Sequence, residues 1–297
     1  MPDVRLWRTG GQARLQTVNL SSSNRYSTRA ACARRRLARP VMRTLKLTIA
    51  YEGTAYVGWQ RQLNGTSIQS SLEAVLATIE GRSVVAAGAG RTDAGVHALG
   101  QVASIQLSHQ ISPQALVRAV NARFPADIRL VSVEEMSVPF HARFDATAKT
   151  YRYYLLNGAV MSPFACRYGW FVGAPLDRER MMDAAQLFVG ERDFAAFQAT
   201  GGATRTTVRT LFGLTIRSAL PEPWFAGDGD GASITVIDVR GSGFLRHMVR
   251  VIVGTLVEVG RGRRSCADVA DALRTGDREL AGQTAPPHGL FLMNVEY

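Results

Sequence analysis

Residues 45–51, LKLTIAY, are where the sequence first shows the pattern of a folded domain. Leu45, Leu47, Ile49 and Tyr51 alternate with polar or small residues, and this period of two predicts a strand with one buried face. The chain has 297 residues and is 46% hydrophobic, which is enough for one large domain or for two halves with a core. The strand therefore opens a globular region that extends to the C-terminus.

The region before this strand has a different composition. Residues 1–41 hold nine arginines and one acidic residue, a net charge of +8 out of the chain's +11, without clear periodicity. This composition fits a disordered extension or an over-long start, an organellar transit peptide, or a basic arm for RNA. We favour the first, since Met42 directly precedes the strand, and we treat residues 1–42 as a basic extension. The rest of the chain carries only +3, so net charge alone does not predict a nucleic-acid partner.

Cysteine usage and hydropathy exclude several classes of protein. The three cysteines lie far apart without CxxC spacing, which indicates free thiols in a reducing compartment, and we expect a cytoplasmic protein. Neither a Cys/His zinc pattern nor HExxH occurs, so we expect no metal. The longest apolar run, VRVIVGTLVEVG, contains an arginine and a glutamate and is too short to span a bilayer.

Outward from the first strand, strands and helices alternate. Thr66–Gln69 predicts a capping box before a helix with apolar residues at helical spacing. Further helices are expected from Ser112, over 178–189, from about 244, and over 266–275. Further strands are expected at 101–107, 128–134, 150–156, 207–217, 234–240 and 290–296. A short link near 142–148 separates two runs of similar order, residues 43–145 and 146–297. We therefore expect a mixed α/β fold of two similar halves, each a sheet covered by helices on one face, with a cleft between them.

The stretch GAGRTDAGVH, residues 88–97, places a cation and a carboxylate in a glycine-rich loop. It is not a dinucleotide or Walker loop, because Asp93 stands where the third glycine belongs and neither lysine of the chain follows a glycine. An aspartate beside glycines is usually a turn residue. Pairing with Arg91 would instead favour the ionised carboxylate that a nucleophile requires. His97 fits a general base or a histidine that hydrogen-bonds the loop backbone, and we favour the second.

Two other segments carry basic residues. In FHARFD, His141 and Arg143 fit either contacts with RNA phosphates or a structural role in the link. In FLRHMVRVIVG, Arg246 and Arg250 are four residues apart, which predicts a shared helix face away from the apolar stripe. That face is either solvated or directed into a cleft. No GxSxG motif or Cys/His arrangement points to a serine or cysteine nucleophile.

The segment KTYRYYLL, residues 149–156, is rich in aromatic side chains. Alternation puts Tyr151 and Tyr153 on one face of a strand and Tyr154 on the other. An aromatic face with flanking cations suits stacking on an unpaired base. For Tyr153 and Tyr154 we favour ordinary packing.

Four motifs occur in order at fitting intervals: AYEGTAYVGWQRQ, GAGRTDAGVHALGQV, FHARFDATAKTYRYYL and GFLRHMVRVIVGTL. Together they resemble the tRNA pseudouridine synthase A family over residues 44–297, with no counterpart for residues 1–41. The resemblance implies the pseudouridine synthase fold, with mostly antiparallel sheets and a central RNA-binding cleft. It implies a homodimer without metal or cofactor. It further implies an isomerase (an intramolecular transferase) that converts uridine to pseudouridine at positions 38, 39 and 40 of the tRNA anticodon stem-loop.

The resemblance also implies roles for single residues. Asp93 becomes the nucleophile, Arg250 the cation that pairs with it, and Arg91 a contact to the flipped nucleotide. Tyr151 becomes the residue that stacks on the target base, with a phenol that helps to remove the C5 proton. Attack at C1′ and attack at C6 both stay open. Close approach of backbone and RNA is expected at three glycines of the loop, Gly88, Gly90 and Gly95.

Two other functions are weighed against this one. The basic and aromatic patches also fit a tRNA-binding module or chaperone without catalysis, whose action would not depend on Asp93. A nucleotide-dependent enzyme is disfavoured by the missing glycine motifs. For the enzyme, the expected catalytic residues are Asp93, Tyr151 and Arg250, and the expected substrate-binding residues are Tyr151, Arg91, His141, Arg143 and Arg246.

Overall fold

The computed structural model describes residues 41–199, 201, 204–219 and 233–297. The predicted basic extension, residues 1–42, lies outside this described part except for its last two residues. The chain divides into two units, residues 1–39 and 40–297, and the fold below is that of the second unit alone.

The described residues form ten strands, five α-helices and three short 3-10 helices. The strands are β1 (Arg43–Tyr51), β2 (Ala87–Gly88), β3 (His97–Leu107), β4 (Ile128–Met136), β5 (Ala148–Asn157), β6 (Trp170–Phe171), β7 (Gly190–Asp193), β8 (Val208–Ala219), β9 (Ser233–Gly241) and β10 (Leu290–Glu296). The α-helices are α1 (Ile68–Glu80), α2 (Pro113–Asn121), α3 (Arg178–Gln186), α4 (Met248–Gly260) and α5 (Cys266–Thr275). The 3-10 helices are η1 (Ala195–Phe197), η2 (Arg278–Leu280) and η3 (Pro287–Gly289).

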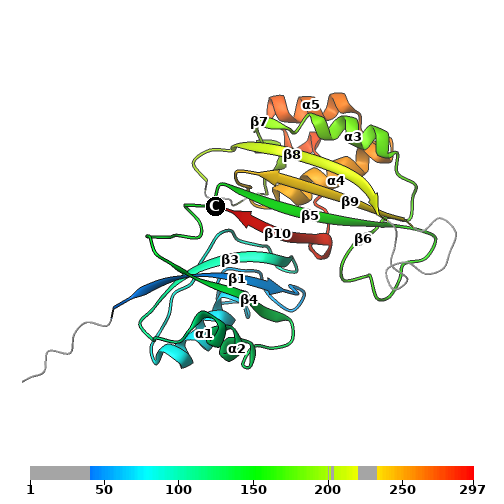
Figure 1. Cartoon of the computed structure of the whole chain (residues 1–297). Helices are drawn as coiled ribbons and strands as arrows, with labels where there is room; N and C mark the ends of the chain where they lie inside the picture. The colour runs from blue at the N-terminus through cyan, green and yellow to red at the C-terminus, as the bar shows by residue number, and fades with distance from the viewer. Residues whose placement is uncertain (1–40, 200, 202–203, 220–232) are drawn as a thin grey trace, which may run out of the picture. The chain divides into compact units, whose positions relative to one another are not determined.

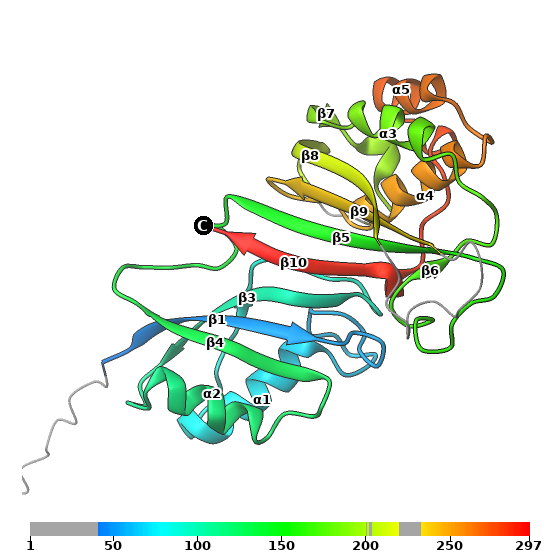
Figure 2. The same ribbon diagram turned by 45° about the vertical axis from the view of Figure 1, so that its right-hand side comes forward.

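All ten strands join one sheet, in the order β4-β1-β3-β10-β5-β9-β8-β7, with β2 beside β3 and β6 beside β5. Every pair is antiparallel except β3–β10 and β5–β6. In Figures 1 and 2, α1 and α2 lie beside β1 and β4, and α3, α4 and α5 lie beside β8 and β9. The predicted mixed α/β class with a mostly antiparallel sheet is confirmed. The similarity of the two halves, 43–145 and 146–297, stays a prediction.

The last strand joins the two groups of strands. β10 pairs in parallel with β3 through Phe291 opposite His97 and Leu292 opposite Ala98, and antiparallel with β5 on its other side. One hydrophobic cluster accordingly runs from the β1 region to the α4 region. The sheet is therefore continuous across the predicted link between the halves, and the expectation of a separate sheet in each half is wrong, because β10 pairs with strands of both.

Helix α4 is the most buried helix and sets the position of one expected site residue. All of its residues are buried except Arg250 and Glu258, as expected of a helix that is apolar on every side. Its backbone lies so close to a later segment that a Cβ added to Gly254 would stand 1.7 Å from the carbonyl oxygen of Gln283. The helix is therefore held in place by packing on all sides.

The predicted start of this helix is wrong. The hydrophobic spacing indicated a start near residue 244, but α4 begins at Met248. His247 has a left-handed backbone with φ of 61°, a conformation that an α-helix does not contain. Leu245 is buried, which produced the apparent periodicity, yet it precedes the helix. Arg246 is outside the helix as well, so the predicted helix face shared with Arg250 does not exist.

Other boundaries also differ from the sequence pattern. The predicted capping box at Thr66–Gln69 is wrong by one residue, because Ser67 caps the helix and the hydroxyl of Ser70 accepts from the Ser67 backbone N–H. The helix predicted at 178–189 ends at Gln186. Strands β2, β6 and β7 were not predicted, since two to four residues are too few for a period-two signal.

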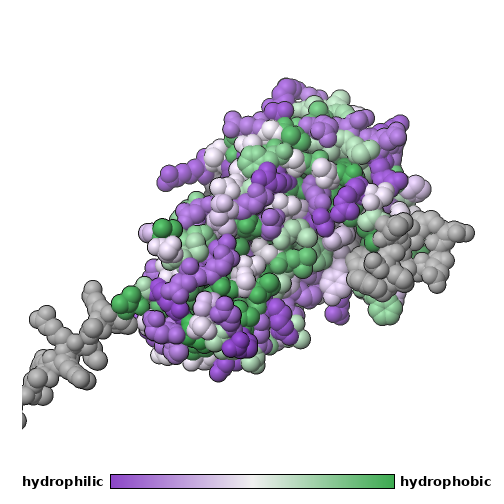
Figure 3. Space-filling view, viewed as in Figure 1, coloured by the Kyte–Doolittle hydropathy of each residue, from purple (hydrophilic) through white to green (hydrophobic). Residues whose placement is uncertain are grey.

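The described part of the chain contains no helix that is long and apolar enough to cross a membrane. It also contains no group of three or more His, Cys, Asp or Glu side chains placed to hold a metal ion. Figure 3 shows hydrophilic and hydrophobic residues interspersed on the face viewed.

Candidate active site

Asp93 lies in the loop between β2 and β3, and both sides of its position are anchored. Its backbone carbonyl accepts a hydrogen bond from the N–H of Val96 at 3.2 Å, and Gly95 within this turn has φ of 76°. Preceding it, the buried Thr92 has its hydroxyl 2.8 Å from that of Tyr51. Asp93 is therefore a turn residue through its backbone. The turn does not use its carboxylate, and 24% of the side chain is exposed.

Glycine is required in this loop because other parts of the protein pack closely against its backbone. A Cβ on Gly88 would meet the Trp59 ring at 2.4 Å, and one on Gly95 would meet Pro287 at 3.0 Å. On the preceding segment, a Cβ on Gly58 would meet the carbonyl oxygen of Thr92 at 2.5 Å. At Gly88 and Gly95 these protein contacts take the space expected for RNA and fix the loop, whereas a Cβ on Gly90 would meet only the Lys149 stem, at 3.4 Å.

Arg250 is the cation that the fold brings to Asp93. Its Nη1 donates to Asp93 Oδ2 at 3.1 Å, and its Nε donates to the carbonyl of Ala285 at 2.8 Å. The backbone of Ala285 donates in return to the carbonyl of Arg250. With the side chain 12% exposed and tied at two atoms, the guanidinium has a fixed orientation toward the carboxylate.

His247 also lies beside Asp93, and the sequence pattern did not single it out. Its Nε2 is 3.6 Å from Asp93 Oδ2. Burial lowers the pKa of His247, the charge of Asp93 opposes this, and the charges of Arg250 and Arg246 lower it further. The imidazole is therefore neutral at pH 7. The one feature of the sequence that could have pointed to His247 is its position three residues before Arg250.

Tyr151 reaches the same region from β5. The ring is buried and packs edge-on against Phe244 with centroids 5.1 Å apart. Burial raises the pKa of its phenol, and the charges of Tyr51 and Asp93 raise it further. The phenol therefore stays protonated at neutral pH, which makes it a hydrogen-bond donor and a weak base.

The other expected binding residues are at the surface. Arg91 is exposed and forms no hydrogen bond or ion pair within the described residues, so its predicted pairing with Asp93 is wrong. Arg246 is exposed in the segment before α4. His141 accepts a hydrogen bond from the N–H of Arg143, and its ring packs at a tilt of 32° against Phe144. It also lines a pocket of about 350 Å³.

The packing interpretations of Tyr153 and Tyr154 are confirmed, and the expected partner of His97 is not. Tyr153 is buried and donates to the carbonyl of Pro286 at 2.7 Å. Tyr154 packs edge-on against Phe291. His97 accepts a hydrogen bond from the N–H of Gly53, and its other ring nitrogen is 3.1 Å from the carbonyl oxygen of Arg167. Both partners of the His97 ring lie outside residues 88–97, so the predicted hydrogen bond to the loop backbone is wrong, and His97 instead links β3 to two other segments.

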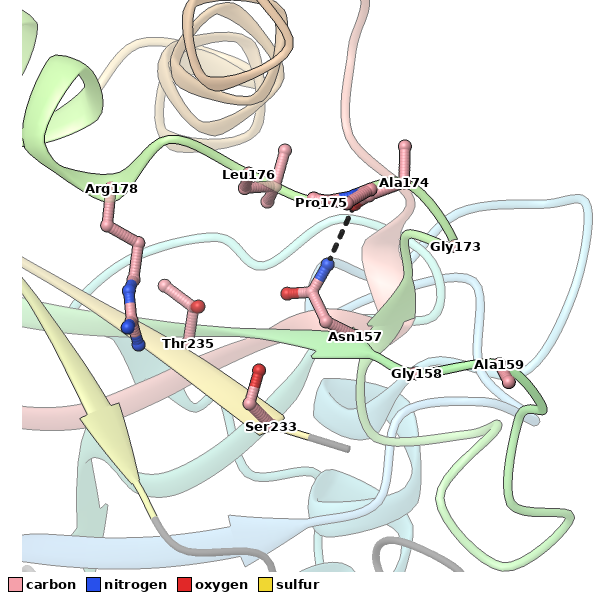
Figure 4. A pocket seen from close by; sticks show the side chains of 10 residues that line it. All are labelled: Asn157, Gly158, Ala159, Gly173, Ala174, Pro175, Leu176, Arg178, Ser233 and Thr235. Atoms are coloured by element: carbon pink, nitrogen blue, oxygen red, sulfur yellow. Dashed lines mark hydrogen bonds between the residues drawn. The ribbon is translucent and has the colours of Figure 1, made fainter. Parts of the chain in front are cut away.

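A second pocket of about 350 Å³ lies away from these residues. It opens at the end of β5, where Asn157 donates to the carbonyl of Ala174, as Figure 4 shows. None of the expected site residues lines it. We assign the candidate active site to the residues around Asp93.

Comparison with known proteins gives the family. The model of a family described as tRNA pseudouridine synthase matches residues 47–145 and 184–297. The tRNA pseudouridine synthase A of Syntrophotalea carbinolica is 48% identical over 261 residues, covering 86% of this chain and 97% of that one. That of Geotalea uraniireducens is 46% identical over 256 residues, covering 86% and 100%.

Among solved structures, a Cbf5-Nop10-Gar1 complex aligns over 84% of this chain and 48% of that chain, with 12% identity. Its TM-score of 0.31 is too low to support an argument.

The family matches include the residues that the fold brings together. The first matched segment contains Asp93 and the second contains His247 and Arg250, while Tyr151 falls between the two. A binding module without catalysis is not favoured by these matches. The chain belongs to the tRNA pseudouridine synthase family, and it is an isomerase that acts on uridine in tRNA.

Proposed function

We propose that this enzyme forms pseudouridine at positions 38, 39 and 40 of the tRNA anticodon stem-loop, with Asp93 as the nucleophile. The observation that carries the proposal is the pair between Asp93 Oδ2 and Arg250 Nη1 at 3.1 Å. Both side chains are mostly buried yet reach solvent, so a substrate atom has access to the carboxylate. The choice of positions rests on the resemblance of the sequence motifs.

The reaction needs a nucleophile and no oxidant. The N1–C1′ bond of uridine breaks, the base turns, and C5 bonds to C1′. C5 then loses its proton, and N1 gains one, so atoms and electrons balance within the nucleotide and water. A carboxylate suits attack at C1′ or at C6, as carboxylates suit the anomeric carbon in glycosidases. In this proposal Arg250 holds Asp93 in place while the bond forms.

Substrate binding requires that the target base leave its stack, at a cost of a few kcal/mol. The Tyr151 ring is buried against Phe244 in the free enzyme. In this proposal it stacks on the base that enters the site, and the stacking offsets part of this cost. Arg91, Arg143 and Arg246 are exposed cations and in this proposal bind phosphates in a salt-dependent way. His141 binds RNA in the same segment as Arg143.

We also propose that the enzyme acts as a homodimer in the cytoplasm. The resemblance supports the dimer. The cytoplasmic location is supported by Cys166 and Cys266, which are free thiols in the described residues, as expected in a reducing compartment. Sedimentation equilibrium of the purified chain tests the oligomeric state. A monomer at micromolar concentration would overturn it.

The function is tested with tRNA transcripts that carry C5-tritiated uridine at only one of positions 38, 39 and 40. The proposal predicts tritium release from each transcript and pseudouridine mapped at that position. A further transcript is labelled at every uridine, and release from this transcript, with none from the three that are labelled at one position, would overturn the choice of positions. Absence of release from every transcript, with a folded enzyme, would overturn the function.

A further inference from the structure

Lys149 is a cation with a mostly buried side chain that the proposed reaction does not use. Its residue is 9% exposed, and it forms no hydrogen bond or ion pair within the described residues. The chain has one other lysine, Lys46, which pairs with Glu134 at 3.4 Å. The stem of Lys149 is buried, while its ammonium reaches solvent and has no anionic partner among the described residues, so this cation is available to a ligand.

The fold brings Lys149 to the loop that carries Asp93. Lys149 and Tyr151 are two residues apart on β5 and therefore share one face of the sheet. A Cβ added to Gly90 would stand 3.4 Å from Cε of Lys149, so the lysine stem lies against the loop next to Arg91. The ammonium, one bond farther along, therefore lies near Gly90, three residues before Asp93 in the same loop.

The protein supplies positive charge, and no anion, to Lys149. Burial lowers the pKa of its ammonium, and the charge of Arg143 lowers it further. No carboxylate of the described residues pairs with it. A partly desolvated ammonium flanked by a second cation is electrostatically complementary to an anion. The anions that a tRNA brings to this site are its phosphodiesters.

We propose that Lys149 binds the backbone phosphate of the nucleotide whose uridine enters the Asp93 site, and so positions that nucleotide. This inference rests on the proposed function. Because Lys149 lies two residues before Tyr151 on the same face of β5, the contact holds the backbone of the nucleotide while the Tyr151 ring receives its base. The phosphate supplies the negative charge that the protein does not place beside the ammonium. The contact therefore stabilises the bound nucleotide.

The variants Lys149→Met, Lys149→Arg and Lys46→Met test the proposal. Lys149→Met removes the charge and keeps an apolar stem, Lys149→Arg keeps the charge, and Lys46→Met removes one charge elsewhere. With tritium-release kinetics, Lys149→Met is expected to raise KM about 10- to 100-fold with a smaller change in kcat. It is also expected to reduce the slope of log K against log salt for tRNA binding by about 0.7–0.9. The other two variants are expected to stay near wild type.

The outcomes separate this inference from the function on which it rests. A wild-type enzyme that forms no pseudouridine overturns the proposed function, while the salt slope still reports the phosphate contact. A folded Lys149→Met variant with unchanged KM and unchanged slope overturns the inference and leaves the function standing.

A second measurement covers the case in which Lys149→Met does not fold. Wild-type enzyme is treated with an amine-reactive reagent, with and without an anticodon stem-loop RNA, and the two lysines are resolved by peptide mass. The RNA is expected to protect Lys149 and to leave Lys46 unchanged. Equal labelling of Lys149 with and without RNA would overturn the inference.

Discussion

Replacement of Arg250 by methionine tests how much the enzyme depends on the cation beside Asp93. Methionine keeps an apolar stem of similar length, so α4 retains its packing. The change removes the hydrogen bond from Nη1 to Asp93 and the one from Nε to Ala285. The carboxylate then keeps the neutral imidazole of His247 at 3.6 Å and has no ion-pair partner with a fixed charge among the described residues.

The expected loss follows from the geometry. A hydrogen bond to a charged group is worth about 1.5–3 kcal/mol. Breaking a fully buried ion pair costs more, about 3–5 kcal/mol, but these two side chains are 12% and 24% exposed. The lower range therefore applies. If the bond is needed to hold Asp93 in the transition state, kcat falls about 10- to 150-fold, at about 1.4 kcal/mol per tenfold.

The assay is single-turnover tritium release at saturating tRNA. The matched control is Arg261→Met, which breaks the pair of Arg261 with Glu258 at 3.5 Å at the other end of α4. That position lies about 16 Å along the helix axis from residue 250, so it is expected to lower the melting temperature without changing kcat. The reasoning is refuted if Arg250→Met keeps wild-type kcat, or if the control loses as much.

Three further predictions concern stability and its relation to turnover. Gly254→Ala places a Cβ 1.7 Å from the Gln283 carbonyl, so we expect a loss of at least about 1–3 kcal/mol in denaturant unfolding, with reduced turnover. His247→Gly removes the cost of holding a non-glycine residue in the left-handed region, about 1 kcal/mol. The melting temperature should therefore be unchanged, while kcat falls because the imidazole beside Asp93 is lost. Burial of the Glu80 carboxyl opposes ionisation, but hydrogen bonds from Ser108 and its neighbours lower its pKa to about 2. Glu80→Gln should therefore destabilise the fold above pH 4.5, and the difference from wild type should vanish as the pH falls toward 2.

Period-two patterns predicted the strands that are buried on one face. In β1 the buried residues alternate with half-buried ones, because one face of the sheet packs on the core. The same alternation predicted which face of β5 carries Tyr151 and Tyr153. It also contained Lys149, two residues before Tyr151, but alternation alone does not show that a lysine lacks a partner.

Backbone conformation was the main property that the hydrophobic pattern missed. Leu245 is buried outside a helix, and hydropathy reports burial without reporting φ. The left-handed His247 therefore appeared only in the structure, and with it the true start of α4 and the proximity of the imidazole to Asp93.

The pairing at the site could not be derived from local patterns. Asp93 and Arg250 are 157 residues apart in sequence, and Arg91, only two residues from Asp93, was the more obvious local partner. The resemblance of the motifs, and not a local pattern, identified Arg250 as the partner of Asp93. The two residues come together only in the folded chain, where β10 joins the two groups of strands. Local chemistry identified the carboxylate, and tertiary structure identified its cation.

The most direct test of the central claim compares wild type with Asp93→Asn for tritium release from C5-labelled uridine in a tRNA transcript. Asparagine keeps the size of the side chain and its turn, so folding and most tRNA binding are expected to persist. Circular dichroism and a tRNA binding isotherm check this. We predict release by wild type and none above background by Asp93→Asn. Release by a folded Asp93→Asn enzyme at a rate near that of wild type would contradict the assignment of Asp93 as the nucleophile.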